Sequence, residues 1–270
     1  MGVNKLFAIS TIFLVLSLPF ATSQEVENEE DFSYLSGTAT GPENWGNIRV
    51  EWAACGNGQM QSPIDLSDRT VQILPQLGEL GGSYKPSNAV LKNRGHDIKL
   101  EWEGEAGGIR INGTEYSLKQ VHWHSPSEHT INGRRYSLEA HLVHLSADNK
   151  IAVVGILYKI GRPDSFLAEL EKYIKKISDV PEGEVVVGVV NPRRIKWEST
   201  NYYRYMGSLT VPPCTEGVVW SVIDKVETVS KRQVDLLREA VDDDAEMNAR
   251  PIQLTNGRPI GFYRPKKFRY

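Results

Sequence analysis

The stretch that decides the fold is QVHWHSPSEHT, residues 120–130, which holds three of the six histidines in a chain of 270 residues. All six histidines lie between residues 96 and 144. Side chains alternate across a β-strand, so His122 and His124 project from the same face while the residues beside them point away. The stretch therefore predicts a strand that presents two imidazoles next to each other.

A second stretch, SLEAHLVHL at residues 137–145, has the same alternation. It places Glu139 and His141 on one face of a strand and His144 on the other. If the face of Glu139 and His141 lines the same cavity as His122 and His124, His141 can be a third metal ligand beside them. His144 then lies in the opposite layer. His129 follows a carboxylate outside the strand, and we expect it to be structural.

Three neutral imidazoles suit Zn²⁺, and three protein ligands leave the fourth tetrahedral position open, as in catalytic zinc sites. An isolated pair of alternating histidines is more often a pair of half-buried polar residues. Here Gln120 and Glu139 each lie two residues before a candidate ligand, where they can hold its second ring nitrogen. We therefore predict a zinc site at His122, His124 and His141.

Short alternating runs, separated by Gly, Pro, Asn or Asp, indicate a mainly β fold. The runs are HDIKLEW (96–102), GIRING (108–113), SLKQVHWH (117–124), SLEAHLVHL (137–145), IAVVGILYKI (151–160), EVVVGVV (184–190) and GVVWSVI (217–223). Two peripheral helices are predicted, at 164–177 with Leu167, Leu170, Ile174 and Ile177 on one face, and at 230–241 with Ser230 as its cap.

The N-terminus has the pattern of a secretory signal: Lys5, the apolar run LFAISTIFLVLSLPF at 6–20, then the small residues ATS. The run is short for a membrane span, so we expect a cleaved signal peptide over residues 1–23 and no membrane anchor. The acidic stretch 24–31 is predicted to be a solvated lead-in. A single domain over 32–270, on the secretory route or outside the cell, is the expected product.

The net charge is −3, or −4 once Lys5 is removed, which gives no reason to expect a nucleic-acid or anionic-membrane partner. An oxidising compartment favours a disulfide between the two cysteines, Cys55 and Cys214. The same compartment makes the NGT sequon at Asn112 a candidate glycosylation site. The sequence does not fix an oligomeric state.

The chain resembles the alpha-class carbonic anhydrases, especially their secreted plant members. The matching stretches follow in order along nearly the whole mature chain: GPENWG (41–46), QSPIDL (61–66), NRGH (93–96), QVHWHSPSEHT (120–130), EAHLVHL (139–145), GSLTVPPCTEGVVW (207–220) and NARPIQ (248–253). The resemblance implies a single domain with a central twisted, mostly antiparallel sheet of about ten strands and zinc at the bottom of a conical cleft.

The resemblance also implies roles for particular residues. It assigns zinc to the same three histidines and pairs Cys55 with Cys214. Thr210 would accept a hydrogen bond from zinc-bound hydroxide and donate one to Glu128. Tyr34 would join the solvent network, and the carbonyl of Asn248 would orient His124.

The activity implied is the reversible hydration of CO₂ to bicarbonate and a proton. CO₂ is small and uncharged, so it needs an apolar patch beside the hydroxide. By resemblance the patch consists of Val143, Val153, Leu209, Val218 and Trp220, although any of them could equally be ordinary core.

By resemblance, His96 in NRGH occupies the position of the family's proton shuttle. A histidine suits that role because an imidazole that titrates near neutral pH can carry the proton out of the cleft. Arg94 and Lys99 stand where the best-known members have asparagines, and nearby positive charge disfavours a protonated imidazole. Val211 replaces a common threonine. We therefore expect slower turnover than in the fastest members.

An alternative is a storage or binding protein on the same scaffold, because some secreted plant relatives accumulate in tubers or nectar and have been linked to redox activities. Relatives without activity lose a ligand histidine. This chain keeps all three, together with Glu128 and Thr210, which favours the enzyme.

Overall fold

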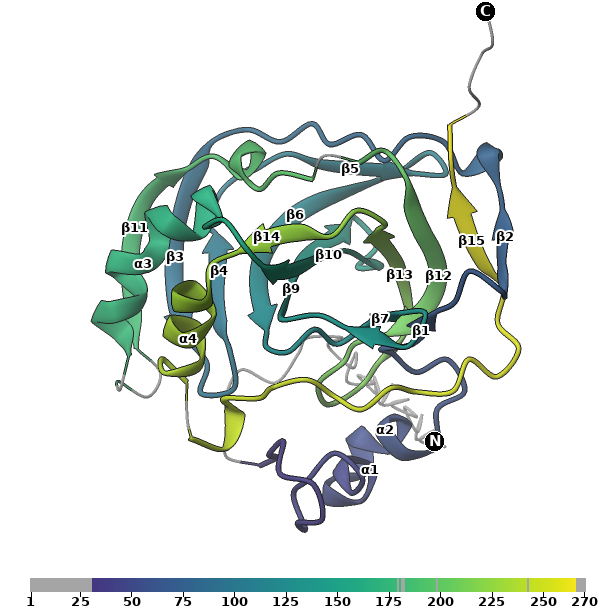
Figure 1. Ribbon diagram of the computed structural model, residues 1–270, viewed down its shortest axis with the longest axis horizontal. Helices are drawn as coiled ribbons and strands as arrows, with labels where there is room; N and C mark the ends of the chain where they lie inside the picture. The colour runs from purple at the N-terminus through teal and green to yellow at the C-terminus, as the bar shows by residue number, and fades with distance from the viewer. Residues whose placement is uncertain (1–30, 179, 181–182, 198, 242, 266–270) are drawn as a thin grey trace, which may run out of the picture.

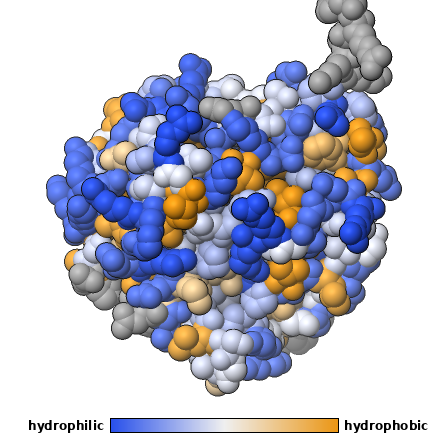
Figure 2. Space-filling model, in the orientation of Figure 1, coloured by the Kyte–Doolittle hydropathy of each residue, from blue (hydrophilic) through white to orange (hydrophobic). Residues whose placement is uncertain are grey.

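The computed structural model describes residues 31–178, 180, 183–197, 199–241 and 243–265. The expected signal peptide and residues 24–30 of the lead-in lie outside these ranges. Within them, no helix combines the length and the apolar character needed to cross a membrane. Hydrophilic side chains cover most of the face shown in Figure 2, and apolar ones form small separate patches.

A sheet of twelve strands forms the body of the protein (Figure 1). Its main path is β11 (Glu184–Val190), β3 (Ser87–Asn93), β4 (Ile98–Trp102), β6 (Thr114–His124), β9 (Leu138–Ser146), β10 (Ile151–Ile160), β13 (Glu216–Ile223), β12 (Tyr202–Ser208), β15 (Ile260–Tyr263) and β2 (Val71–Ile73), with β5 (Gly108–Ile111) on β6 and β14 (Glu227–Val229) on β10. Within this sheet, the pairs β10–β13, β10–β14 and β15–β2 are parallel and the other described pairs are antiparallel. The expected mainly β, mostly antiparallel fold is confirmed.

The remaining elements are short or peripheral. A small second sheet contains β1 (Asp65–Leu66), β7 (Thr130–Ile131) and β8 (Arg134–Arg135), and the helices are α1 (Trp45–Ile48), α2 (Ala54–Asn57), α3 (Ser165–Ile177) and α4 (Lys231–Arg238), with 3₁₀ turns at Val50–Trp52, Pro75–Leu77, Pro192–Arg194 and Asp243–Ala245. Figure 1 shows α3 and α4 beside the end of the sheet that carries β11 and β3.

Both predicted long helices are confirmed, and each begins at a cap that the sequence contains. The Asp164 side chain accepts a hydrogen bond from the Leu167 amide at the start of α3. Ser230 and Gln233 form a reciprocal capping box at the start of α4, which satisfies amides that have no partner inside the helix. The apolar face predicted for α3 is buried, so the helix packs against the sheet.

Each of the seven runs predicted as strands contains a strand, but the sequence analysis missed β3 and β12. In β3, residues 89–91 are buried on both faces, so the run lacks the alternation that identifies a half-exposed strand. The short strands β1, β2, β7, β8, β14 and β15 were also missed.

The two faces of β6 and β9 enter different cores, as the alternation predicted. Val121 and Leu142 belong to the large cluster that also contains the buried face of α3. Val143 and Trp220 belong to a second cluster on the opposite face. His122, His124 and His141 lie on this second face, between the sheet and the second core.

The predicted disulfide between Cys55 and Cys214 is confirmed, with the two Cα atoms 5.0 Å apart. It joins α2 to the segment between β12 and β13. Both cysteines lie in a third apolar cluster with Phe32, Trp45 and Trp52. The N-terminal helices are therefore attached to the sheet by a covalent bond and by aromatic packing.

His144 leads to a prediction about acid stability. Its Nε2 accepts a hydrogen bond from the Tyr84 hydroxyl at 2.9 Å, and burial lowers its pKa from 6.5 to about 4. The unfolded chain therefore binds more protons between these pH values, so this contribution to stability is complete above pH 6.5 and is lost as the pH falls toward 4. We expect urea unfolding to show a smaller acid loss in His144→Gln than in the wild type. An equal loss of stability at acid pH in the two proteins would show that His144 does not cause it.

Candidate metal site

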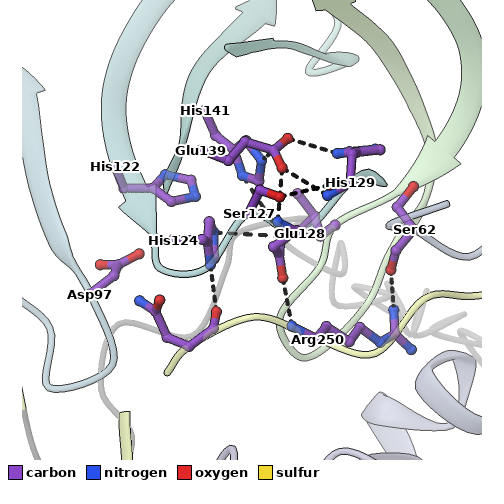
Figure 3. A network of polar contacts seen from close by, with 12 residues as sticks. Ser62, Asp97, His122, His124, Ser127, Glu128, His129, Glu139, His141 and Arg250 are labelled. Carbon is purple, nitrogen blue, oxygen red and sulfur yellow. Dashed lines mark hydrogen bonds and ion pairs between the residues drawn. The ribbon is translucent and has the colours of Figure 1, made fainter. Parts of the chain in front are cut away.

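Three imidazoles converge where β6 and β9 lie side by side (Figure 3). His122 is directly opposite His141 in the strand register, and His124 follows on the same face of β6. One ring nitrogen from each histidine lies within 4.8 Å of the others. All three side chains are buried. The structure therefore brings together the three residues that the sequence predicted as ligands.

An acceptor fixes the outer nitrogen of each imidazole. His122 Nδ1 donates to the Gln120 side-chain oxygen at 2.8 Å, and His141 Nε2 donates to Glu139 Oε1 at 2.9 Å. His124 Nδ1 donates to the backbone oxygen of Asn248 at 2.7 Å. These bonds leave Nε2 of His122, Nε2 of His124 and Nδ1 of His141 facing the cavity.

The inner nitrogens fit a metal ion. His124 Nε2 is buried and has no hydrogen-bond partner, which costs free energy unless something else binds it. Three imidazoles with their second nitrogens held by oxygen acceptors are the usual ligand arrangement for zinc, and they leave a fourth coordination position for water. The donor set therefore suits a catalytic zinc site.

Burial and nearby carboxylates shift the pKa values of His122 and His124 in opposite directions. Burial lowers the pKa of His122 well below its usual range, against the opposing attraction of Asp97. Burial also disfavours the charged form of His124, but the negative charges of Glu128 and Asp97 and the hydrogen bond to the Asn248 backbone together outweigh it and raise the pKa of His124. A metal binds the neutral form of an imidazole, so binding at His124 competes with protonation.

Sequence analysis assigned His129 to structure but did not predict its hydrogen-bond partners. His129 Nδ1 donates to Glu139 Oε1 at 2.7 Å, and its Nε2 accepts from the Tyr205 hydroxyl at 2.7 Å. Ser62 continues the chain with a 2.8 Å contact to that hydroxyl. Nothing in the spacing of these residues indicates the network, because it joins segments that are far apart in the sequence.

Glu128 lies beside the cavity with its two oxygens in different environments. Oε1 accepts a hydrogen bond from the Arg250 amide at 2.9 Å. Oε2 lies 3.7 Å from His124 Nε2 and 3.9 Å from His141 Nδ1, and it has no hydrogen-bond partner. The bond that the resemblance implies from Thr210 is therefore absent here, although Thr210 is buried and Glu128 Oε2 is available to accept it.

His96, expected as the proton shuttle, is completely buried. Its Nδ1 donates to the Arg94 backbone oxygen at 3.1 Å, and its ring packs on Phe32 with 5.3 Å between ring centroids. Carrying a proton to solvent would require the ring to leave Phe32. The shuttle role stays a prediction.

The charges expected to disturb His96 have partners. Arg94 donates from Nε to Asp97 Oδ1 at 2.7 Å, and Lys99 pairs with Glu101 at 3.5 Å. Burial would raise the pKa of Asp97, but the Arg94 guanidinium, together with His96 and His122, holds it well below its usual range. The sequence analysis weighed the cations without Asp97, which Figure 3 places beside His122.

The other predicted residues fall into three places. Val143, Val153, Leu209, Val218 and Trp220 are buried together in the second core cluster. Tyr34 and Val211 lie in the aromatic cluster near the disulfide. Asn112 is exposed in the turn between β5 and β6 with a φ of 48°.

The family model for eukaryotic-type carbonic anhydrases matches residues 40–264. The chain belongs to the alpha carbonic anhydrase family. Alpha carbonic anhydrase 7 of Arabidopsis thaliana is 55% identical over 260 residues, which cover 96% of this chain and 94% of that protein.

Solved structures of carbonic anhydrase relatives agree with the fold. A dioscorin complexed with ascorbate is 50% identical, with a TM-score of 0.86 over 88% of this chain and 100% of that one. The alpha carbonic anhydrase of Thermovibrio ammonificans, in complex with the inhibitor sulfanilamide, is 36% identical, with a TM-score of 0.75 over 85% of this chain and 98% of that one.

The geometry predicts which histidines hold zinc. His122→Ala or His141→Ala should lose most bound zinc on dialysis, because two imidazoles cannot hold a tetrahedral ion against competing water. His144→Gln is the matched control, since His144 lies on β9 but faces the other core, and it should keep its zinc. The measurement is zinc per protein by atomic absorption. Full zinc in either alanine variant would refute the ligand assignment.

Proposed function

We propose that this protein is a zinc-dependent carbonic anhydrase that interconverts CO₂ and bicarbonate. The observation that supports the proposal best is the orientation of the three imidazoles, each held at its outer nitrogen so that the inner one faces a common point. A zinc ion bound there would lower the pKa of a coordinated water and supply hydroxide at neutral pH.

In this proposal, Glu128 and Thr210 set the direction of attack. Glu128 can only accept hydrogen bonds when ionised, so a Thr210 hydroxyl that donates to Oε2 has its lone pairs left for an O–H in the cavity. That arrangement turns the lone pair of the attacking oxygen toward the substrate. Tyr34 is assigned to the solvent network on resemblance alone.

The substrate binds against the apolar side of the cavity. Val143, Leu209 and Trp220 come from three different segments and meet in one buried cluster. CO₂ has no charge to be recognised, so apolar walls that exclude water suit it better than hydrogen-bonding groups. Val153 and Val218 complete the proposed pocket.

A second candidate is a binding or storage protein on the same scaffold. The 50% identity to a dioscorin whose structure contains ascorbate favours this candidate. A storage role does not require the ligands, Glu128 and Thr210 all to be kept, and here the imidazoles are also oriented for a metal. We therefore place catalysis first.

We propose a secretory location, which the Cys55–Cys214 disulfide supports because such bonds persist in oxidising compartments. The exposed turn position of Asn112 suits attachment of a glycan. Both features agree with a signal peptide over residues 1–23 and a domain over 32–270.

One experiment tests the proposed function directly. Zinc content and CO₂ hydration are measured on the same purified mature protein, before and after treatment with a chelator. We expect bound zinc, hydration that the chelator abolishes, and recovery on adding zinc. Hydration that persists without zinc, or a zinc-loaded protein without hydration, would reject the proposal.

The proton relay is assigned to His96, and a variant tests it. His96→Ala should slow turnover in weakly buffered solution and spare kcat/KM for CO₂, because attack on CO₂ precedes the relay. Added imidazole buffer should restore part of the loss. His144→Gln, which removes a histidine from the other core, should change neither constant. If His96→Ala behaves like that control, His96 is structural.

A further inference from the structure

Arg250 lies between Glu128 and Ser62, and its side chain is almost completely buried (Figure 3). Nη1 donates to Gln61 Oε1 and to the Ser62 backbone oxygen, each at 2.8 Å. Nη2 donates to the Cys55 backbone oxygen at 2.8 Å. The guanidinium therefore cross-links residues that are about 190 positions away in the sequence.

The guanidinium of Arg250 carries its positive charge although none of its hydrogen bonds goes to a carboxylate. Burial lowers its pKa to about 10, and the nearby negative charge of Glu128 opposes the shift, so the guanidinium stays protonated at neutral pH. Its hydrogen-bond acceptors are neutral, and it lies 5.7 Å from the centre of the Trp45 ring. Burying such a charge costs free energy, which a purely structural position could avoid with an apolar side chain.

The backbone of Arg250 reaches Glu128. Its amide donates to Glu128 Oε1 at 2.9 Å, which fixes one carboxylate oxygen and leaves Oε2 facing the imidazoles. Figure 3 shows Arg250 with its backbone toward Glu128 and its guanidinium toward Ser62. The position of that amide depends on where the guanidinium is anchored.

The side chain of Arg250 reaches the Thr210 loop through Gln61. Gln61 accepts from Arg250 at Oε1, and its Nε2 donates to the Cys214 backbone oxygen at 3.1 Å. Two further hydrogen bonds close the loop, from the Leu209 amide to the Thr215 oxygen and from the Cys214 amide to the Val211 oxygen. Thr210 lies inside this closed loop.

We propose that Arg250 is a positioning residue that sets the distance between Glu128 and Thr210. Its backbone holds the carboxylate, and its guanidinium holds the loop of the hydroxyl through Gln61. The inference rests on the proposed function, because it concerns the carboxylate and hydroxyl that direct attack. It adds a residue whose side chain touches neither metal nor substrate.

Glu128 and Thr210, which Arg250 positions, should affect the binding of two kinds of small molecule at the metal differently. When Thr210 donates to Glu128, its oxygen can accept from a ligand with an N–H, such as sulfanilamide. Thiocyanate has no hydrogen to donate and gains nothing from Thr210. Displacing Glu128 or Thr210 should therefore weaken the binding of sulfanilamide but not that of thiocyanate. General damage to the cavity should weaken the binding of both ligands.

The test compares Arg250→Gln with the matched control Arg258→Gln. Arg258 also donates to backbone oxygens, those of Gln61 at 2.7 Å and Met206 at 3.0 Å, and it also lies 5.7 Å from an aromatic ring centre, that of Tyr205. Its side chain has no hydrogen bond to Ser62 or Cys55. Binding is followed by the visible spectrum of the cobalt-substituted proteins, and the exchange of the residue 250 amide is followed by NMR in the metal-free proteins.

In Arg250→Gln we expect the sulfanilamide Kd to rise about tenfold, the effect of losing one hydrogen bond to a charged group, with thiocyanate affinity unchanged. The residue 250 amide should exchange faster than in the wild type. Arg258→Gln should match the wild type in all three measurements. If Arg250→Gln does not fold, Arg250→Lys, which keeps the charge but loses the forked donors, should show the same selectivity.

Unchanged sulfanilamide affinity in Arg250→Gln, equal weakening of both ligands, or the same change in Arg258→Gln would overturn the inference. A wild-type protein that binds no metal would instead refute the proposed function. In that case the amide exchange still decides the inference, because it needs neither metal nor activity.

Discussion

Three buried imidazoles share one cavity, and the rest of the site depends on this constraint. Burial disfavours several like charges close together, and each neutral ring has one nitrogen that donates and one that accepts. The donor must find an oxygen. Gln120, Glu139 and Asn248 supply these oxygens, and in doing so they aim the three accepting nitrogens at one point.

Glu139 and Asn248 make further hydrogen bonds of their own, which extend the site far into the protein. Glu139 also accepts from His129, whose ring reaches Tyr205 in the second core. The Asn248 side chain accepts from the Ser125 amide at 2.7 Å, directly after His124. Hydrogen bonds from His124 and Ser125 therefore hold the segment of Asn248 against the end of β6.

The positive charges of Arg94 and Lys99 beside the cavity are compensated by carboxylates. Arg94 and Asp97 form a buried pair, and Lys99 pairs with Glu101 toward the surface. Paired charges produce a weaker field than isolated ones, so the cavity has apolar residues on one side and compensated charges on the other. His96, the predicted relay, is itself buried and packs against Phe32.

The sequence by itself determined the local features of this protein. The period of two in β6 and β9 put His122, His124 and His141 on one face, and the caps and apolar spacing of α3 and α4 marked both helices. These features depend on neighbours in the chain, so a pattern can reveal them. The run of β3 was missed because a strand buried on both faces has no alternation.

Only the tertiary structure decided how distant segments complete the site. The contact of His129 with Glu139, the pairing of Arg94 with Asp97 and the reach of Arg250 to Cys55 leave no periodic signal in the sequence. Each depends on where the fold leaves a buried donor near an acceptor. The physical reason is that a buried polar group must be satisfied by whatever oxygen or nitrogen the packing places within reach, however far away it lies in the chain.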